Sequence, residues 1–382
     1  MNITSNVKYV GVNDRITDLF ESQYRIPGGI SYNSYAIIDE KIAIMDSVDL
    51  KFTDEWLSNV ENATGGVSPD YLVVQHMEPD HSASICAFAD KYPAAVIVSS
   101  AKAFTMMKNF FGVDFADRRI VVAEGDVLSL GTHELTFITA PMVHWPEVIM
   151  TYDKTDKVLY SADAFGKFGI PEEDDGWVNE ARRYYIGIVS KYGVQVQNVL
   201  KKISALDISV ICPLHGPVLS DNLDFYTSLY QTWSSYAPES SGVTVAYSSI
   251  YGNTAAAAEE LYALLRDGGC EVALFDLARC DKAEAIASAF RYSKLVLASA
   301  TYNGDVFPDM RSYINGLVER GFSGRTVAFV ENGSWAPMAA KVMRASLESC
   351  KNVTFAQNSV KILSSLNDES RAALKALAEE LI

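Results

Sequence analysis

The sequence predicts an α/β protein of two domains, a two-sheet sandwich with outer helices followed by a doubly wound parallel sheet. At 382 residues the chain is longer than one ordinary domain. Short β runs with a few helices fill roughly the first two thirds, whereas strands and helices alternate strictly after a Pro/Ser/Gly stretch at 237–242. We therefore expect a linker at this stretch, a first domain at 1–240 and a second at 241–382.

The first part of the chain is rich in short apolar runs separated by turn residues. The expected strands are 7–11, 34–38, 42–46, 71–75, 95–99, 120–123, 135–139, 148–152, 158–161 and 208–212. The expected helices are 52–60, 83–91, 101–110 and 222–236. Strand-rich sequence with interspersed helices is typical of two packed sheets with helices outside, an αββα sandwich.

The second part follows a strand–helix rhythm. Apolar strands are expected at 243–247, 272–275, 295–298, 326–330 and 360–362, and helices at 253–266, 282–290, 309–321, 336–349 and 368–382. Continuous apolar strands that alternate with helices indicate a five-stranded parallel sheet with helices on both faces.

Composition excludes several classes of function. The net charge of −16 argues against binding to nucleic acid, which needs a basic face. The sequence contains no run of about 18 apolar residues, the length that would predict a membrane span. The five cysteines are scattered without a Cys-x-x-Cys pair, which argues against a zinc ribbon, a rubredoxin-type iron centre and a Cys₄ iron–sulfur cluster. A reducing cytoplasm is the expected compartment.

Seven potential metal ligands follow expected strands of the first domain: His76, Glu78, Asp80, His81, His144, Asp163 and His215. They include four of the five histidines; the fifth, His133, is expected to be an ordinary surface or core residue. Because an extended segment alternates its faces, one loop can present ligands to two metals. A carboxylate such as Asp163 can bridge two cations. Nitrogen and oxygen donors without cysteine suit iron, manganese or zinc.

The run His76-Met-Glu-Pro-Asp-His81 resembles the first motif of the metallo-β-lactamase superfamily, which is usually His-x-His-x-Asp-His. Glu78 stands at the second histidine of that motif. Together with the flavodoxin-like second half, this substitution resembles the flavodiiron proteins (A-type flavoproteins) over nearly the whole chain. The resemblance implies two irons, one bound by His76, Glu78 and His144 and the other by Asp80, His81 and His215, with Asp163 as the bridge.

The chain departs from this family at one position. Many members carry a histidine near the metals in a segment similar to 27–35, where this sequence has Gly28 or Gly29. The departure removes none of the seven ligands, but it leaves any gating or proton-supplying role of that histidine without a counterpart.

The turn after the first strand of the second domain, 247–254, combines hydroxyls, a glycine and a helix start. Backbone N–H groups at a helix N-terminus, with the Ser249 and Thr254 hydroxyls, favour a phosphate. The spacing is neither Gly-x-Gly-x-x-Gly nor a P-loop, and the turn resembles that of flavodoxins, which implies FMN. Loops 299–304 and 331–336 follow two further strands, where Tyr302 and Trp335 can flank the flavin ring. The expected FMN-binding residues are Ser249, Ile250, Tyr251, Gly252, Asn253, Thr254, Ala300, Thr301, Tyr302, Asn303, Gly304, Asn332, Gly333, Ser334 and Trp335.

The resemblance implies an oxidoreductase that reduces O₂ to water, NO to N₂O, or both. Two ferrous ions and a reduced flavin hold four electrons, the number that O₂ needs. The implied donor is a separate rubredoxin or a reduced deazaflavin, and the implied assembly is a head-to-tail homodimer or a dimer of dimers. The alternative is a zinc-dependent hydrolase with a flavodoxin-like accessory domain, against which Glu78 and the three flavin loops argue.

Overall fold

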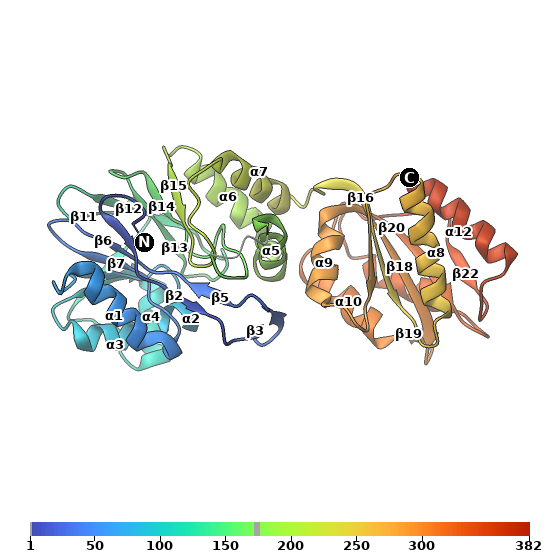
Figure 1. Cartoon of the computed structure of the whole chain (residues 1–382), viewed down its shortest axis with the longest axis horizontal. Helices are drawn as coiled ribbons and strands as arrows, with labels where there is room; N and C mark the ends of the chain where they lie inside the picture. Colours follow the sequence, from blue (N-terminus) through green and yellow to red (C-terminus); the bar gives the residue numbers. More distant parts are fainter. Residues whose placement is uncertain (1, 172–175) are drawn as a thin grey trace. The chain divides into compact units, whose positions relative to one another are not determined.

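The computed structural model describes residues 2–171 and 176–382 (Figure 1). It consists of two compact units, Met1–Tyr185 with Val194–Gln231 and Ile186–Gly193 with Thr232–Ile382. Each unit is described by itself. None of the helices in the described residues is long and apolar enough to cross a membrane.

The first unit contains two main sheets. One has the order β1 (Val7–Tyr9), β6 (Tyr35–Ile37), β7 (Ala43–Met45), β8 (Tyr71–Val73), β9 (Val96–Ser100) and β10 (Arg119–Val122). The other has the order β11 (Val127–Ser129), β12 (Glu134–Thr139), β13 (Ile149–Asp153), β14 (Val158–Tyr160) and β15 (Val210–Cys212). Strands β7 to β10 pair in parallel, as do β14 and β15. Their carboxyl ends therefore meet at common edges, where loops can gather side chains.

An apolar layer lies between the two sheets. Tyr35 and Val73 of the first sheet belong to the same buried cluster as Phe137 and Tyr160 of the second. Helices α1 (Thr53–Thr64), α3 (Ile85–Lys91) and α4 (Ala101–Phe111) cover the first sheet, and α6 (Gly193–Ile203) and α7 (Leu223–Ser234) lie beside the second (Figure 1). The αββα prediction is confirmed.

Several strands and helices of this unit were not predicted. They are β2 (Val12–Asp14), which pairs with β5 (Ile30–Tyr32), the two-residue strands β3 (Leu19–Phe20) and β4 (Tyr24–Arg25), β11, the one-turn helix α2 (Pro79–Ser82), α5 (Trp177–Tyr184) and α6. Strands of two or three residues are too short to show an alternating apolar pattern, which is the signal on which sequence-based assignment depends.

The second unit is a parallel sheet with the order β17 (Val272–Asp276), β16 (Ser240–Ser248), β18 (Tyr292–Tyr302), β20 (Thr326–Asn332) and β22 (Val360–Ile362). This is the flavodoxin-like order 2-1-3-4-5, so the predicted doubly wound sheet is confirmed. Two short strands were not predicted: β21 (Thr354–Phe355), parallel to β20, and β19 (Asp305–Val306), antiparallel to β18.

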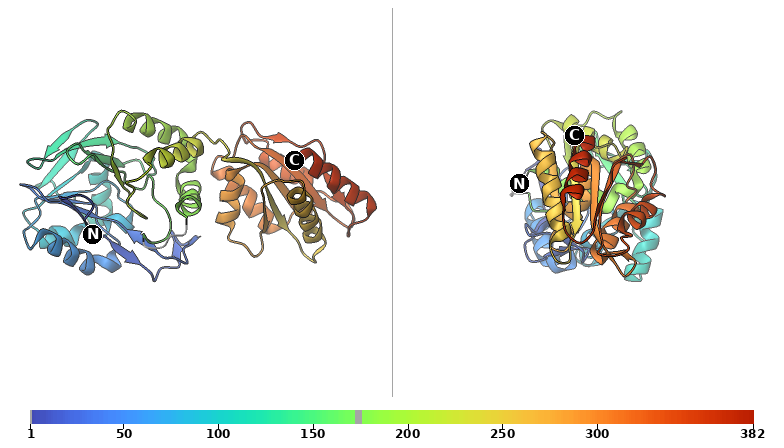
Figure 2. Two further views of the ribbon diagram at one scale, coloured as in Figure 1. Left: turned by 45° about the horizontal axis from the view of Figure 1, so that its top comes forward. Right: turned by 90° about the vertical axis from the view of Figure 1, so that its right-hand side faces the viewer.

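Helices cover both faces of this sheet (Figure 2). Helices α8 (Asn253–Asp267) and α12 (Asp368–Leu381) pack on one face, and α9 (Lys282–Arg291), α10 (Pro308–Glu319) and α11 (Ala339–Leu347) on the other (Figure 1). The predicted linker at 237–242 is partly wrong, because β16 already begins at Ser240.

Candidate metal centre and flavin pocket

The loop after β8 carries the dense cluster of candidate ligands. The buried carboxylate of Asp46 accepts hydrogen bonds from the backbone N–H of Gln75 at 2.7 Å and of His76 at 3.4 Å. Pro79 begins the one-turn helix α2, a position at which proline is favoured because its missing N–H would be unpaired anyway. This turn presents Asp80 and His81 to the site directly after Glu78.

His76, Glu78 and His144 converge on one point, which we call the first metal position. The Oε2 atom of Glu78 lies 3.3 Å from His76 Nε2 and 3.0 Å from His144 Nε2. Asp80, His81 and His215 converge on a second metal position. The Oδ2 atom of Asp80 lies 3.2 Å from His81 Nε2 and 3.3 Å from His215 Nε2.

Asp163 lies between the two positions. Its Oδ2 is 3.0 Å from His144 Nε2 and 3.5 Å from His76 Nε2, whereas its Oδ1 is 3.6 Å from His81 Nε2 and 3.9 Å from His215 Nε2. Each oxygen thus faces a different histidine pair, which is the geometry of a bridging carboxylate.

The donor set fits a pair of metal ions. First-row metals bind imidazole nitrogen and carboxylate oxygen at about 2.0–2.2 Å, so neighbouring ligand atoms lie roughly 3 Å apart. Both oxygens of Asp163 and both of Asp80 are buried without a hydrogen-bond partner among the described residues. Buried carboxylate oxygens are costly when unpaired, and two cations would satisfy all four.

The burial and close approach of these ligands also shift their pKa values. Burial lowers the pKa of His81 to about 4. Burial opposes protonation of His144 as well, but Asp163 and Glu78 outweigh it and raise its pKa to about 9. Burial opposes ionisation of Asp163, yet the surrounding histidines hold its pKa well below the usual range. The Asp163 carboxylate is thus held in the anionic form that a metal requires.

Gly29 adopts a left-handed conformation with φ of 72°, and a Cβ there would lie 2.2 Å from the carbonyl oxygen of Asp14. The backbone at this residue therefore has no room for a side chain. Sequence reasoning missed Glu21 in the β3–β4 turn, whose carboxyl group lies near Glu78 and His144. Burial of its carboxyl group and the nearby Glu78 carboxylate raise the pKa of Glu21 to about 7.

His133 lies outside this site. It is fully buried, and its Nδ1 lies 2.7 Å from Asp153 Oδ2 while its Nε2 lies 3.0 Å from Asn6 Nδ2. Asp153 and Asp156 bring carboxylates near it. Both ring nitrogens are already engaged, so His133 acts as a core histidine that ties the N-terminal segment to the second sheet.

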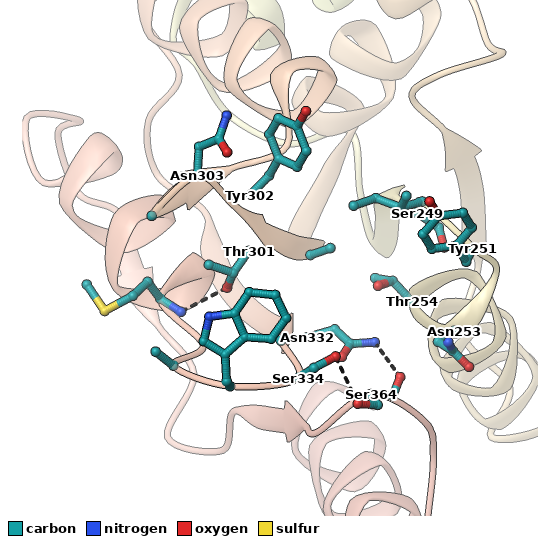
Figure 3. A pocket seen from close by; sticks show the side chains of 17 residues that line it. Ser249, Tyr251, Asn253, Thr254, Thr301, Tyr302, Asn303, Asn332, Ser334 and Ser364 are labelled. Carbon is teal, nitrogen blue, oxygen red and sulfur yellow. Dashed lines mark hydrogen bonds between the residues drawn. The ribbon is translucent and has the colours of Figure 1, made fainter.

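The second unit contains a cavity of about 600 Å³ at the carboxyl ends of β16, β18 and β20 (Figure 3). This is the switch point of the strand order, where doubly wound sheets bind ligands. Every expected FMN-binding residue lines the cavity except Gly252, which instead precedes α8 with φ of 92°. Ala336, Met338 and Ser364 also line it and were not predicted.

The cavity suits a flavin in shape and charge. All the described residues that line it are neutral, and the N-terminus of α8 supplies dipoles for a phosphate. Two hydrogen bonds support its loops: Asn332 Nδ2 donates to the Ser364 carbonyl oxygen at 3.0 Å, and the Met338 N–H donates to Thr301 Oγ1 at 2.9 Å (Figure 3). Trp335 is 84% exposed and Tyr302 44% exposed, so both rings are free to contact a planar ligand.

The chain is similar to several known proteins over most of its length. Residues 30–216 match the family model described as ODP family beta lactamase. Nitric oxide reductase of Moorella thermoacetica is 29% identical over 361 residues, which are 91% of this chain and 90% of that protein. The flavodiiron protein of Giardia intestinalis superposes with a TM-score of 0.90 at 25% identity, over 99% of this chain and 96% of that one. The chain is thus similar to flavodiiron proteins over nearly its whole length.

The chain is also similar in fold to rubredoxin oxygen:oxidoreductase from Desulfovibrio gigas. Its TM-score with this chain is 0.92 at 24% identity, over 100% of this chain and 97% of that one. Because the likeness covers both units, it shows that each of them has the fold of its counterpart in that protein.

Proposed function

We propose that this protein is a flavodiiron oxidoreductase that reduces O₂ to water, NO to N₂O, or both. The observation that carries the proposal is Asp163, whose two oxygens face two separate histidine pairs. A paired site of nitrogen and carboxylate ligands with a neutral flavin cavity in the same chain is what a multi-electron reductase needs. The domains proposed are 1–240 for the metals and 241–382 for FMN.

In this proposal the seven candidate residues hold two irons, three terminal ligands at each position and Asp163 between them. When bound, two irons and FMN supply up to four electrons to a small molecule. The extra carboxylate Glu78 favours iron over zinc, because it makes the site harder and more anionic.

The chain's own residues decide how a diatomic molecule reaches this site. His76, His81 and His215 have fully buried side chains, whereas those of Glu78, Asp80 and His144 are 12%, 10% and 7% exposed. A diatomic molecule therefore enters the site past the partly exposed side chains of Glu78, Asp80 and His144. The rings of Phe20 and Tyr184 pack against His215 and exclude water from the opposite side.

In the second unit, we propose that the N-terminus of α8 and the hydroxyl of Thr254 bind the phosphate of FMN, while Trp335 and Tyr302 contact the flavin ring. The proposed donor is a rubredoxin or a reduced deazaflavin, since no Cys-x-x-Cys iron module occurs in the sequence. We further propose a cytoplasmic homodimer, head-to-tail or as a dimer of dimers.

The test is metal and flavin analysis of the purified protein, followed by anaerobic gas consumption with reduced rubredoxin or reduced deazaflavin. We expect two irons and one FMN per chain and turnover of at least one of the two gases. Zinc without flavin, together with hydrolytic activity, would support the hydrolase instead. Rates for both gases on one preparation rank O₂ against NO.

A further inference from the structure

His76 has a carboxylate partner at Nδ1, which neither histidine of the second metal position has among the described residues. Its Nδ1 donates a hydrogen bond to Glu147 Oε1 at 2.8 Å, and the backbone N–H of Met77 donates to the same oxygen at 2.9 Å. Both side chains of the His76–Glu147 pair are fully buried. Because a carboxylate only accepts, the proton of His76 is fixed on Nδ1, and Nε2 keeps its lone pair toward the metal position.

The Nδ1 atoms of the two histidines of the second position have no carboxylate partner among the described residues. His215 Nδ1 donates to the backbone carbonyl oxygen of Ser31 at 2.7 Å. His81 Nδ1 is buried without a hydrogen-bond partner in the described part of the chain. Rings of Phe20, Tyr32 and Tyr184 pack against His215.

Carboxylates beyond the ligands are also unevenly placed. Asp46 accepts from the backbone N–H of His76, and Glu21 lies near Glu78, but the pKa of each is raised to about 7, so neither carries a full negative charge at neutral pH. The corresponding group on the other side, Asp14, lies behind Tyr32, whose hydroxyl is 3.3 Å from Asp14 Oδ2. The bridging Asp163 is shared, so it does not alter the difference. Among the described residues, Glu147 is therefore the one carboxylate beyond the seven candidate ligands that pairs directly with a ligand imidazole.

We infer that Glu147 is a positioning residue that makes the two metal positions electronically unequal, so that the first position holds the ferric ion when the pair is half oxidised. This inference rests on the proposed diiron function. A buried negative charge stabilises the ion of higher charge, and a carboxylate that accepts from a ligand imidazole makes that imidazole a stronger donor. One-electron oxidation of the diferrous pair, for example by ferricyanide, then removes the electron from the first position.

The test is an anaerobic redox titration of the iron-loaded protein and of Glu147→Gln, followed by electron paramagnetic resonance of the mixed-valent state. The measured quantity is the comproportionation constant. It is the equilibrium constant for the reaction in which one diferrous pair and one diferric pair give two mixed-valent pairs. We expect this constant to fall at least about tenfold in Glu147→Gln, because the two potentials approach each other by about 59 mV. The glutamine keeps the shape and an acceptor oxygen but lacks the charge.

Two further variants separate charge from structure. Glu147→Asp keeps the charge and is expected to keep the constant within about threefold of the parent value. Asp153→Asn is the control outside the metal site. It removes a buried carboxylate that pairs with a histidine in the same way, since Asp153 Oδ2 lies 2.7 Å from His133 Nδ1. It is expected to leave both potentials unchanged.

The outcomes are distinct. An unchanged constant in iron-loaded Glu147→Gln would overturn the inference, as would an equal fall in Glu147→Asp or in Asp153→Asn. Loss of iron from Glu147→Gln but not from Glu147→Asp supports the role of the charge, whereas loss from both overturns it. If the parent protein holds zinc and shows no iron potentials, the proposed function fails instead.

Discussion

The Nε2 atoms of His81 and His215 lie 3.0 Å apart, although 134 residues separate them in the chain. The two rings come from the loop after β8 and the loop after β15, and both are fully buried. Two lone pairs at this distance repel unless a proton or a cation lies between them. In the metal-free protein a neutral tautomer can supply that proton, whereas the buried, unpaired oxygens of Asp80 and Asp163 are satisfied by bound cations.

Metal removal is therefore expected to destabilise the first unit. At free metal 1,000 times above its Kd, binding contributes about 4 kcal/mol to the free energy of unfolding. Calorimetry of chelated and loaded protein should show a lower Tm for a transition that FMN does not affect. Zinc added to the chelated protein should restore the Tm without restoring gas reduction, because zinc does not change oxidation state. An unchanged Tm after complete chelation would contradict this.

Substitution of the bridge should affect both metal positions at once. Asp163→Ala removes one oxygen from each position, so we expect at least a 100-fold loss of metal affinity (roughly the upper end for outer-sphere changes) and loss of activity. FMN content should stay at one per chain, because the flavin cavity belongs to the other unit. His215→Ala is the matched variant and should retain close to one metal. Full activity of Asp163→Ala would refute the bridging role.

Trp335 is expected to contribute to flavin binding through its exposed ring. Aromatic contacts are worth about 0.5–1.5 kcal/mol beyond burial, so Trp335→Ala should weaken FMN binding roughly 2- to 13-fold. Titration of the flavin-free protein with FMN, followed by flavin fluorescence, measures this directly. Trp335→Phe keeps a ring and should lose less than half of that free energy. Equal affinity in all three proteins would place the flavin away from this side chain.

Most of the site could be predicted because its signals are local. The seven candidate ligands follow recognisable strands, and the chain from His76 to His81 is dense in donors. Glu147 and Asp46 could not be predicted, since a single acidic residue is usually solvated and only the folded chain reveals its partner. The hairpin that carries Glu21 was missed for a different reason: strands of two residues, with positive φ at Glu21 and Ser22, leave no periodic pattern to read.

Asp46 leads to a prediction on pH. It is fully buried, and burial raises its pKa from 3.8 to about 7 despite hydrogen bonds from Gln75 and His76. As the pH rises, Asp46 loses its proton near pH 4 in the unfolded chain but only near pH 7 in the folded protein. Between these two pH values, folding therefore takes up a proton. The free energy of unfolding of the metal-free protein should therefore fall as pH rises through this window, by roughly 3–4 kcal/mol from this group, and level off above it.

Asp46→Asn isolates this contribution. The amide keeps an oxygen for the backbone N–H of Gln75, and Gln75 Oε1, which is buried without a partner among the described residues, can turn to accept from the new NH₂. Urea unfolding of metal-free parent and variant at several pH values should give a difference that grows in favour of the variant from pH 4 to 7. Asp46→Ala removes the acceptor altogether and should lower stability by about 1–3 kcal/mol at pH 4. A difference between parent and Asp46→Asn that does not change with pH would show that Asp46 does not titrate in this range.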